Sequence, residues 1–303
     1  MRKITVIGSI TQDTINLPYG KQTKSFGGIF YNLLSLSYLS SKNVKTYPIC
    51  NLGEDIHKDV IKILDERENI VKGGIKKSKG RNNAVCLFCK KSGKRKEFLL
   101  SLVPPLNFSQ IKPYLNSALI LVNFISGFDL SLKTLEKIRA STTKPIYIDI
   151  HSLSLGVKKN GERFPKKPKL WKRYIKCADM LQMNWGEFSI LSGRKVKNIN
   201  QIKVWAEKIL KLGPKVIIIT LGKRGAFMMY CKEDKTGYYF SQNRTDEVMD
   251  AVGCGDVFTS AFIISYLQTR NLKSSLDFAN KVANFKSTFS GAGNLRELSR
   301  FAR

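Results

Sequence analysis

The sequence has 303 residues, of which 43% are hydrophobic, and its 52 Lys and Arg outnumber its 23 Asp and Glu to give a formal charge of +29. This length and apolar content suffice for a sizeable core, and they indicate a globular protein of one large domain or two ordinary ones. No apolar run approaches the ~20 residues of a membrane span, and the opening MRKITVIGSITQD lacks the cleavage site of a secretory signal. The six cysteines are scattered, which suggests reduced thiols. We therefore expect a soluble, cytoplasmic protein without membrane attachment.

The N-terminal region begins with a predicted strand in ITVIGSI, residues 4–10, which Asp13 follows. Gly27 and Gly28 then stand directly before an apolar run that contains Asn32. This order predicts a glycine turn that opens the first helix. From the residues alone, Asp13 is either a ligand-binding carboxylate or a turn or cap residue, and the two glycines could form a plain turn.

A different pattern occupies residues 72–103, where NAVCLFCKK and KEFLLSLV are strand-like and the turn SGKR separates them. These residues predict a hairpin inserted between α/β segments. Its strands need a further partner, for which residues 14–25 are the candidate. Cys86 and Cys89 form the only close cysteine pair, and without a second pair or a nearby His they favour core packing over a zinc site.

Strands and helices alternate from residue 118 onward. Apolar strands are predicted at 118–124, 145–150, 179–183 and 215–220, with helices at 130–141, from about 184, and at 199–212. Strands this apolar are expected where helices cover both faces of a parallel sheet. Ligands gather at the carboxyl ends of such strands, where Asp149, Asn184 and Thr220 fall.

The segment DAVGCGD, residues 250–256, puts a glycine-rich turn in front of VFTSAFIISYL, which predicts a buried helix that begins near Gly255. The unpaired N–H groups and the dipole of a helix start favour an anion, and Gly253 and Gly255 let backbone amides approach it. Asp256 would repel a phosphate there, so we interpret it as a general base for an attacking hydroxyl. The alternative is that Asp256 only caps the helix.

Taken together, these motifs resemble the ribokinase-like (PfkB) family of sugar and nucleoside kinases, whose signature DTxGAGD is similar to residues 250–256. Residues 27–32 resemble the family's GGxxxN segment, 51–55 its GxD stretch, 184–187 its NxxE motif and 220–226 its TxGxxGA loop. The elements occur in the family's order and cover nearly the whole chain.

The resemblance implies one ribokinase-like α/β domain over residues 1–303, with a central, mostly parallel sheet flanked by helices on both faces. It also implies a small β lid built from insertions at about 13–26 and 72–103, through which two copies could dimerise. The implied activity is ATP-dependent phosphoryl transfer to a hydroxyl of a sugar, nucleoside or related small alcohol. Mg²⁺ is the implied metal, and a monovalent cation such as K⁺ would lie near Ala251 and the SGAG at 290–293.

Roles follow from the matching positions. In the catalytic step, Asp256 would be the base. The negative charge that develops on the phosphate would be stabilised by the backbone amides of Gly253, Cys254 and Gly255. The acceptor would be bound by Asp13, Gly27, Gly28 and Asn32. The nucleotide would be bound by Asn184, Thr220, Gly222, Gly225 and Asn284, and Glu187 would hold the water shell of Mg²⁺. The residues alone leave open that Asn184 and Glu187 form a first-turn cap, that Gly225 is a hairpin turn, and that Asn284, like Lys281, is ordinary helix surface.

The chain departs from the family pattern at Ala251, Cys254 and His151, where the family usually has Thr, Ala and Asn. None of these changes removes the proposed base. Position 254 contributes its backbone N–H, so a cysteine is tolerated there if its side chain has room.

The positive charge is concentrated in two runs. Residues 72–96 carry ten Lys or Arg and no acid, and 158–176 carry nine against Glu162 alone. The charge could be solvated surface without function, a phosphate site for a sugar phosphate at Arg95 and Lys96, or a surface for RNA or DNA. The alternative function is therefore a weakly active or inactive family member that binds nucleic acid or acts in assembly. The intact Asp256 favours the kinase.

Overall fold

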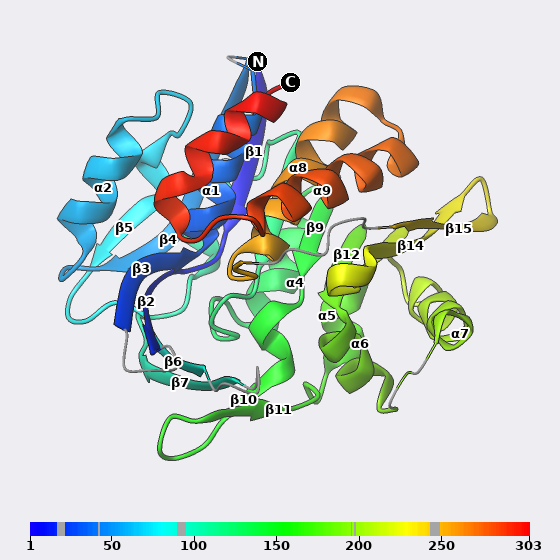
Figure 1. Cartoon of the computed structure of the whole chain (residues 1–303), viewed down its shortest axis with the longest axis horizontal. Coiled ribbons are helices and arrows are strands. Elements are labelled where there is room, and N and C mark those ends of the chain that lie inside the picture. Colours follow the sequence, from blue (N-terminus) through cyan, green and yellow to red (C-terminus); the bar gives the residue numbers. More distant parts are fainter. Residues whose placement is uncertain (17–21, 42, 90–94, 195, 197, 243–248) are drawn as a thin grey trace.

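The computed structural model describes the chain except for residues 17–21, 42, 90–94, 195, 197 and 243–248. Within the described residues, nine strands form one large sheet in the order β15-β14-β13-β12-β9-β8-β1-β4-β5 (Figure 1). These strands are β1 (Arg2–Ile7), β4 (Val44–Gly53), β5 (Ile75–Ser78), β8 (Leu119–Asn123), β9 (Ile146–Asp149), β12 (Met180–Asn184), β13 (Val216–Thr220), β14 (Ala226–Lys232) and β15 (Lys235–Ser241). Strands β13 to β5 pair in parallel, and only β14 and β15 are antiparallel additions. The predicted α/β class with a mostly parallel sheet is confirmed.

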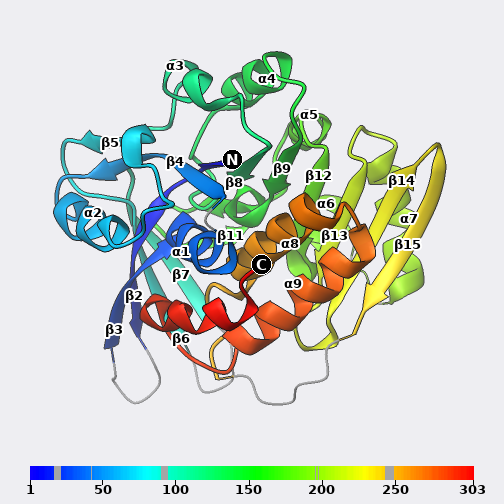
Figure 2. The same cartoon turned by 90° about the horizontal axis from the view of Figure 1, so that it is seen from above.

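Helices cover both faces of this sheet, as Figure 2 shows from above. One face carries α1 (Ile29–Leu39), α2 (His57–Asp65), α8 (Cys254–Thr269), α9 (Leu272–Lys286) and η5 (Ala292–Phe301). The other face carries α3 (Phe108–Ile111), α4 (Leu132–Ala140), α5 (Trp171–Lys176), α6 (Trp185–Ser192) and α7 (Ile199–Leu210). Shorter turns are η1 (Lys72–Gly74), η2 (Lys112–Tyr114), η3 (His151–Ser154) and η4 (Gly222–Arg224). Among the described helices, none has the length and apolar character needed to cross a membrane.

The apolar strands contribute side chains to two separate cores, because successive side chains of a strand point to opposite faces of the sheet. In β8, Leu119 and Leu121 pack with the core under α1, α8 and α9, whereas Ile120 and Val122 pack with the core under α4 to α7. Both sets are fully buried. The near-continuous apolar runs of the sequence therefore reflect a sheet that is covered on both sides.

A second, small sheet has the order β3-β2-β6-β7, formed by β2 (Ile10–Asn16), β3 (Gln22–Gly28), β6 (Ala84–Cys89) and β7 (Arg95–Ser101). It lies beside the carboxyl ends of the large sheet (Figure 1). Two expectations need correction. The run 4–10 is not one strand, because β1 ends at Ile7 and Ile10 already begins β2, so that Asp13 lies within a strand of the small sheet. The expected insertion at 72–103 also includes β5, which pairs with β4 in the large sheet.

A hairpin that the sequence did not suggest follows η3. Strands β10 (Leu155–Val157) and β11 (Arg163–Pro165) pair antiparallel. They lie next to the small sheet in Figure 1, and a bridge between Phe98 and Glu162 joins the two. This hairpin occupies part of the basic run 158–176 and brings its one acidic residue to the site described below.

Candidate active site

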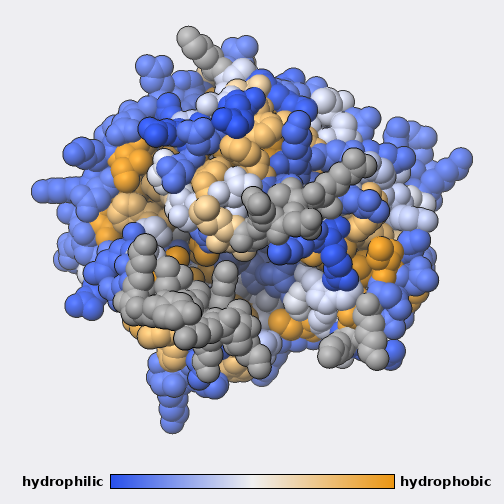
Figure 3. Space-filling model, viewed as in Figure 1, coloured by the Kyte–Doolittle hydropathy of each residue, from blue (hydrophilic) through white to orange (hydrophobic). Residues whose placement is uncertain are grey.

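Two cavities open at the carboxyl ends of the central strands. The smaller, of about 440 Å³, lies between the small sheet, the start of α1, the β10–β11 hairpin and the start of α8. The larger, of about 1000 Å³, lies between the ends of β9, β12 and β13, the turn η4 and helix α9. We refer to them as the smaller and the larger cavity. Figure 3 shows that hydrophilic side chains cover much of the molecular face in this view, with scattered apolar ones between them.

Asp256 lies where the two cavities meet and lines both. It is in the first turn of α8 and only 7% exposed. The N-cap of α8 is Gly253, which makes no side-chain cap hydrogen bond, and the Asp256 carboxylate instead accepts a hydrogen bond from Asn123 Nδ2 at 2.8 Å. Asp256 thus contacts β8 across the site, and its carboxylate also has a hydrogen bond to its own backbone in the first turn of α8, which is compatible with the capping alternative.

Asn123 is a site residue that the sequence reasoning missed. Its Nδ2 also donates to Asn32 Oδ1 at 3.0 Å, and Asn32 Nδ2 donates to the carbonyl oxygen of Asp256 at 2.9 Å. Asn123 ends an apolar strand, the same signal that singled out Asp149 and Asn184, so it could have been found in this way. The three residues form one buried network that fixes the Asp256 side chain.

Asn32 therefore needs a correction. It was expected to present its amide to the acceptor, but it is fully buried, and its amide is bonded to Asp256, to Asn123 and, at 3.4 Å, to Ser260. Tyr31 lines the cavity instead. Its large ring fills the cavity side of α1, so the next residue is turned towards α8.

Gly253 allows the turn in front of α8 to approach α1 closely. Its φ of 76° lies in the left-handed region, and a Cβ there would be 2.3 Å from the Tyr31 ring. The predicted anion-binding residues Gly253, Cys254 and Gly255 all line the larger cavity. The Cys254 amide also makes a long turn bond of 3.3 Å to the Ala251 carbonyl. The helix start therefore presents backbone N–H groups and positive dipole next to Asp256.

Burial, and then their mutual proximity, raise the pKa of the acids around this point. Burial, and then the neighbouring Asp149, raise the pKa of Asp256 to about 8. Burial, and then Glu187, raise the pKa of Asp149 well above its ordinary value, although Gln182 and Thr259 donate hydrogen bonds to it at 2.8 and 3.2 Å. Negative charge is therefore costly here unless a cation joins it.

Asn184 and Glu187 line the larger cavity and also form a capping box at the start of α6. Asn184 Oδ1 accepts from the Glu187 amide at 3.0 Å, and Glu187 Oε2 accepts from the Asn184 amide at 2.9 Å. The capping alternative is thus realised. Burial, and to a smaller extent the charge of Asp256, raise the pKa of Glu187 to about 8, although the hydrogen bond from the Asn184 amide lowers it. The described residues hold no cluster of three or more His, Cys, Asp or Glu side chains that could ligate a metal directly.

The remaining residues predicted to bind a nucleotide also border the larger cavity, namely Thr220, Gly222, Gly225 and Asn284. Thr220 ends β13, and Gly225 belongs to the turn that leads antiparallel into β14, so the hairpin interpretation of Gly225 holds as well. Lys281 is exposed on α9 and lies over the ring of Phe301, 5.7 Å from its centroid. It does not line the cavity.

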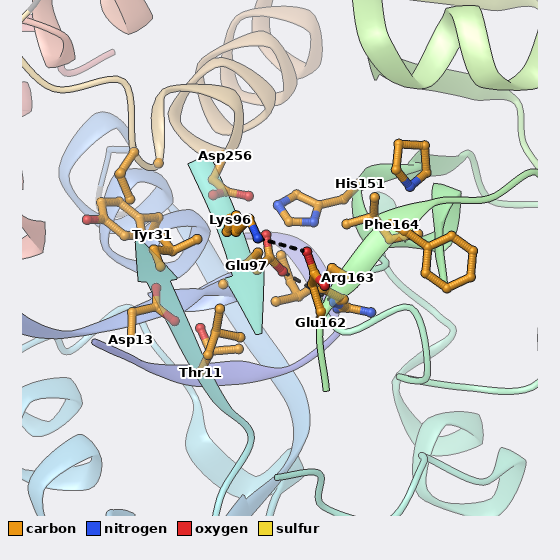
Figure 4. A pocket seen from close by; sticks show the side chains of 18 residues that line it. Thr11, Asp13, Tyr31, Lys96, Glu97, His151, Glu162, Arg163, Phe164 and Asp256 are labelled. Carbon is orange, nitrogen blue, oxygen red and sulfur yellow. Dashed lines mark hydrogen bonds and ion pairs between the residues drawn. The ribbon is translucent and has the colours of Figure 1, made fainter. Parts of the chain in front are cut away.

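Asp13 and Gly28 line the smaller cavity. Asp13 is 8% exposed, and burial raises its pKa to about 6. Gly27 pairs with Thr11 across β2 and β3, and a Cβ on it would lie 1.9 Å from Asp13 Oδ2. A side chain at position 27 would therefore displace the Asp13 carboxylate, which in Figure 4 faces Asp256 across the cavity.

Ion pairs join the small sheet to the β10–β11 hairpin at the rim of the smaller cavity (Figure 4). Lys96 Nζ lies 3.7 Å from Glu162 Oε1, and Arg163 Nε lies 3.3 Å from Glu97 Oε1. Arg163 also donates to the Ser126 carbonyl at 2.7 Å. Each basic residue of the described lining is thus paired with a carboxylate. The side chain of Arg95 lies outside the described part of the chain.

His151 lines both cavities and has a φ of 38°. Its Nδ1 lies 3.0 Å from the hydroxyl of Ser152. Burial, and then the charge of Arg163, lower its pKa to about 4. The ring is therefore neutral at physiological pH and can offer a hydrogen bond without adding charge.

Sequence comparison identifies relatives for this chain. A family model described as pfkB family carbohydrate kinase matches residues 1–298. Ribokinase of Staphylococcus aureus is 30% identical over 111 residues, which are 36% of this chain and 35% of that protein. The ATP-dependent 6-phosphofructokinase of Thermoanaerobacterium thermosaccharolyticum is 37% identical over 93 residues, 31% of this chain and 26% of that one. The chain thus matches about a third or less of the length of these curated relatives.

Solved structures match along nearly the whole chain. A pyrophosphate-dependent kinase in the ribokinase family, in a sulfate complex, has a TM-score of 0.79 at 19% identity, covering 98% of this chain and 99% of that chain. Arabidopsis thaliana ribokinase complexed with ribose and ATP has a TM-score of 0.75 at 17% identity, covering 99% of both. At these identities the likeness shows the ribokinase fold, as predicted.

Proposed function

The chain belongs to the pfkB family of carbohydrate kinases, and we propose that it transfers a phosphoryl group from ATP to a hydroxyl of an uncharged sugar, nucleoside or related polyol. One observation carries this proposal. Asp256 lies at the meeting point of a smaller and a larger cavity, beside the start of α8. A base at that point can take a proton from a hydroxyl in one cavity while the helix start binds the phosphate that enters from the other.

The proposed mechanism is direct, in-line transfer. Asp13 accepts hydrogen bonds from acceptor hydroxyls and orients one of them towards Asp256. Asp256 takes its proton as the oxygen attacks the terminal phosphorus, and the backbone N–H groups from Gly253 to Gly255 stabilise the charge that develops on the phosphate oxygens. Asn123 and Asn32 hold the carboxylate in place through the bonds described above. An acceptor that fills the smaller cavity would displace water from it, which limits wasteful hydrolysis.

The donor set near Glu187 fits Mg²⁺, which retains most of its water ligands in phosphoryl-transfer sites. Asn184, Glu187 and Asp149 supply oxygen atoms next to the larger cavity. Burial first, and neighbouring negative charge second, raise the pKa of both acids, and a divalent cation would offset this cost. When bound, Mg²⁺ would neutralise charge on the phosphate oxygens. Glu187 and Asn184, which line the cavity, would hold its water shell.

ATP is the donor that the larger cavity favours. A volume of about 1000 Å³ exceeds what a pyrophosphate alone requires, and the cavity extends past Gly222 to Ala283 and Asn284 on α9, where a base and ribose could lie. One fold relative is nevertheless named as pyrophosphate-dependent, so the donor is part of the test.

The proposed function is tested by measuring donor-dependent phosphorylation of a panel of sugars, polyols and nucleosides, with ATP and with pyrophosphate as donors. We expect ADP release that depends on one class of acceptor and on Mg²⁺. Turnover with pyrophosphate but not with ATP would overturn the donor assignment. Absence of acceptor-dependent turnover with either donor would overturn the kinase proposal.

The described lining of the smaller cavity supports an uncharged acceptor. Its basic side chains, Lys96 and Arg163, already face Glu162 and Glu97, and Lys158 also pairs with Glu162 at 2.9 Å. The one Arg163 nitrogen without a partner, Nη1, is itself buried. A phosphate group on the acceptor would meet paired cations and unpaired acids. The Lys96 side chain is thus better explained as an ion-pair partner than as a sugar-phosphate ligand.

We therefore expect kcat/KM for a neutral acceptor to exceed that for its phosphate ester by about 10-fold or more, since one buried like-charge contact costs over 1 kcal/mol. Glu162→Gln should narrow this ratio, because it leaves Lys96 and Lys158 without their carboxylate. Glu136→Gln is the matched control, since Glu136 forms its ion pair with Arg173 at 2.7 Å away from this cavity. A phosphate ester preferred by the unmodified chain would contradict the prediction.

A pH dependence follows from the raised pKa of Asp256. The base must be ionised to accept a proton, so kcat/KM should rise about 10-fold per pH unit up to about pH 8 and then level off. His151, with its pKa lowered to about 4, stays neutral across this range. The measurement is the initial rate at low concentrations of both substrates, which reports the free enzyme. A rate that is flat between about pH 6 and about 9 would remove Asp256 as the titrating base.

The second candidate function, binding of nucleic acid or a role in assembly, has the charge of +29 in its favour. It predicts salt-dependent affinity for nonspecific RNA together with no phosphoryl transfer. Dimerisation through the small sheet also remains a proposal, supported by the exposed side chains of Phe88 and Leu100, at 45% and 63%. Sedimentation velocity of the unmodified chain and of Leu100→Lys tests it.

A further inference from the structure

Lys286, in the last turn of α9, has a side chain that is 0% exposed. An ammonium group removed from water is costly unless oxygen atoms and an opposite charge surround it. Lys286 Nζ donates to the Phe289 carbonyl at 3.1 Å and lies 3.7 Å from Asp250 Oδ2. The ring centroids of Phe289 and Tyr31 are 5.3 and 6.0 Å away. A fully buried ammonium group with these contacts indicates a specific function, and the proposed mechanism does not involve Lys286.

The contacts of Asp250 connect this cation to the phosphate-binding turn. Asp250 Oδ1 accepts a hydrogen bond from the Val252 amide at 2.9 Å, which shapes the turn that ends at Gly253. The amides of Met249 and Asp250 donate to the Ser287 carbonyl at 2.8 and 3.1 Å. The ammonium and this carbonyl therefore hold the chain before α8 against the end of α9. Any loosening of Asp250 would move the helix start that meets the phosphate.

The same place was expected to hold a monovalent cation, between the loop near Ala251 and the residues 290–293. The described residues do not fit a K⁺ ion there, since the Asp250 carboxylate already faces the Lys286 ammonium and a second positive charge would be repelled. We propose that the Lys286 ammonium is a built-in monovalent cation that positions Asp250 and the phosphate-binding turn, so that the protein works without K⁺. The inference rests on the proposed kinase function.

The test compares the unmodified chain with Lys286→Ala, Lys286→Met and a control, Lys273→Met, which changes an exposed lysine at the other end of α9. Turnover is measured in potassium, sodium and tetramethylammonium chloride at equal ionic strength. The unmodified chain and the control should differ by less than about twofold between salts, and both Lys286 variants should lose about 10- to 100-fold in kcat. In Lys286→Ala, K⁺, ammonium or methylammonium should restore part of the loss, whereas tetramethylammonium, which is too large for the space left by the side chain, should not.

Thermal melting without substrates provides a readout that needs no turnover. K⁺ should raise the melting temperature of Lys286→Ala relative to tetramethylammonium, because a cation that binds only the folded state stabilises it. It should leave the unmodified chain unchanged. Failure of the kinase assay with an intact melting response would count against the proposed function and not against this inference.

Three results would overturn the inference. The first is that K⁺ activates the unmodified chain several-fold, and the second is that Lys286→Met keeps full turnover. The third is that no small cation changes the turnover or the melting temperature of Lys286→Ala. If the Lys286 variants fold poorly, Asp250→Asn gives a second route. This substitution leaves the buried ammonium without its carboxylate, so we expect both the stability and the turnover of the variant to fall, and K⁺ to restore neither. A variant as stable as the unmodified chain would contradict the proposal.

Discussion

Replacing Asp256 by Asn is expected to lower kcat by about 10²- to 10⁴-fold, the usual contribution of a positioned general base. The substitution keeps the size of the side chain, and its amide oxygen can still accept the hydrogen bond that Asn123 Nδ2 makes to Asp256 at 2.8 Å. The loss would therefore reflect the missing base and not a displaced helix start. The measurement is ADP release with the acceptor found in the panel, at saturating donor and acceptor.

The same variant is expected to be more stable than the unmodified chain. Burial raises the pKa of Asp256 to about 8, so the folded chain holds this proton more tightly than the unfolded chain does. The stability that this proton confers is complete below the unfolded value near 4 and is lost as the pH rises through about 8. Asn carries no such charge, so Asp256→Asn should melt higher than the unmodified chain at pH 8 and about equally at pH 4.

Asp234→Asn is the matched control for this experiment. Asp234 is exposed in the turn between β14 and β15 and has a φ of 61°, which Asn tolerates well. Its turnover and melting temperature should both equal those of the unmodified chain. An Asp256→Asn variant that kept more than about a tenth of kcat would mean that Asp256 is not the base.

Gly253→Ala is expected to reduce both stability and turnover. Its backbone has a φ of 76°, which costs a non-glycine residue about 1–3 kcal/mol, and its Cβ would lie 2.3 Å from the Tyr31 ring. Because the ring is held within α1, the turn must shift and take the first amides of α8 with it. We expect a loss in kcat of about 10²- to 10³-fold, comparable to removing one donor from an anion site. Thermal melting and steady-state kinetics measure the two effects.

Gly255→Ala separates local strain from a general effect of adding a methyl group. A Cβ at Gly255 meets no atom within 4 Å, and the residue already lies in the first turn of α8, so its melting temperature should be unchanged or higher. The double variant Gly253→Ala with Tyr31→Ala should recover part of the strain of the first change, because the clash is gone while the positive φ remains. Equal melting temperatures for Gly253→Ala and the unmodified chain would refute the account.

The strand ends illustrate what could be predicted from the sequence. Asp149, Asn184 and Thr220 follow apolar runs, and parallel strands bring their carboxyl ends to one edge, so their convergence follows from pattern and general topology. Asn123 obeys the same rule and was missed only because the rule was not applied to it. Asn32 was assigned to the acceptor by its motif, but the choice between cavity and interior depends on how α1 packs against α8, which the motif does not encode.

The ion pairs of the smaller cavity lay beyond sequence reasoning. Lys96 and Glu162 are far apart in the chain and meet only because the β10–β11 hairpin packs beside the small sheet. Charge counting identified the run 158–176 as a basic segment with a single acid, Glu162, and could not place that acid in the fold. Its position next to Lys96 favours a neutral acceptor over the sugar phosphate that the basic residues had left open.

The sequence by itself determined the α/β class, the glycine turn before α8 and the family, because periodicity, turn residues and short motifs act over a few neighbouring positions. Only the tertiary structure decided that Asp256 lines two cavities, that Asn123 holds it, and that the buried Lys286 ammonium lies against Asp250. The physical reason is that burial and electrostatic pairing depend on which distant segments pack together. A lysine near the end of a helix looks like solvated surface until α9 and the loop before α8 enclose it.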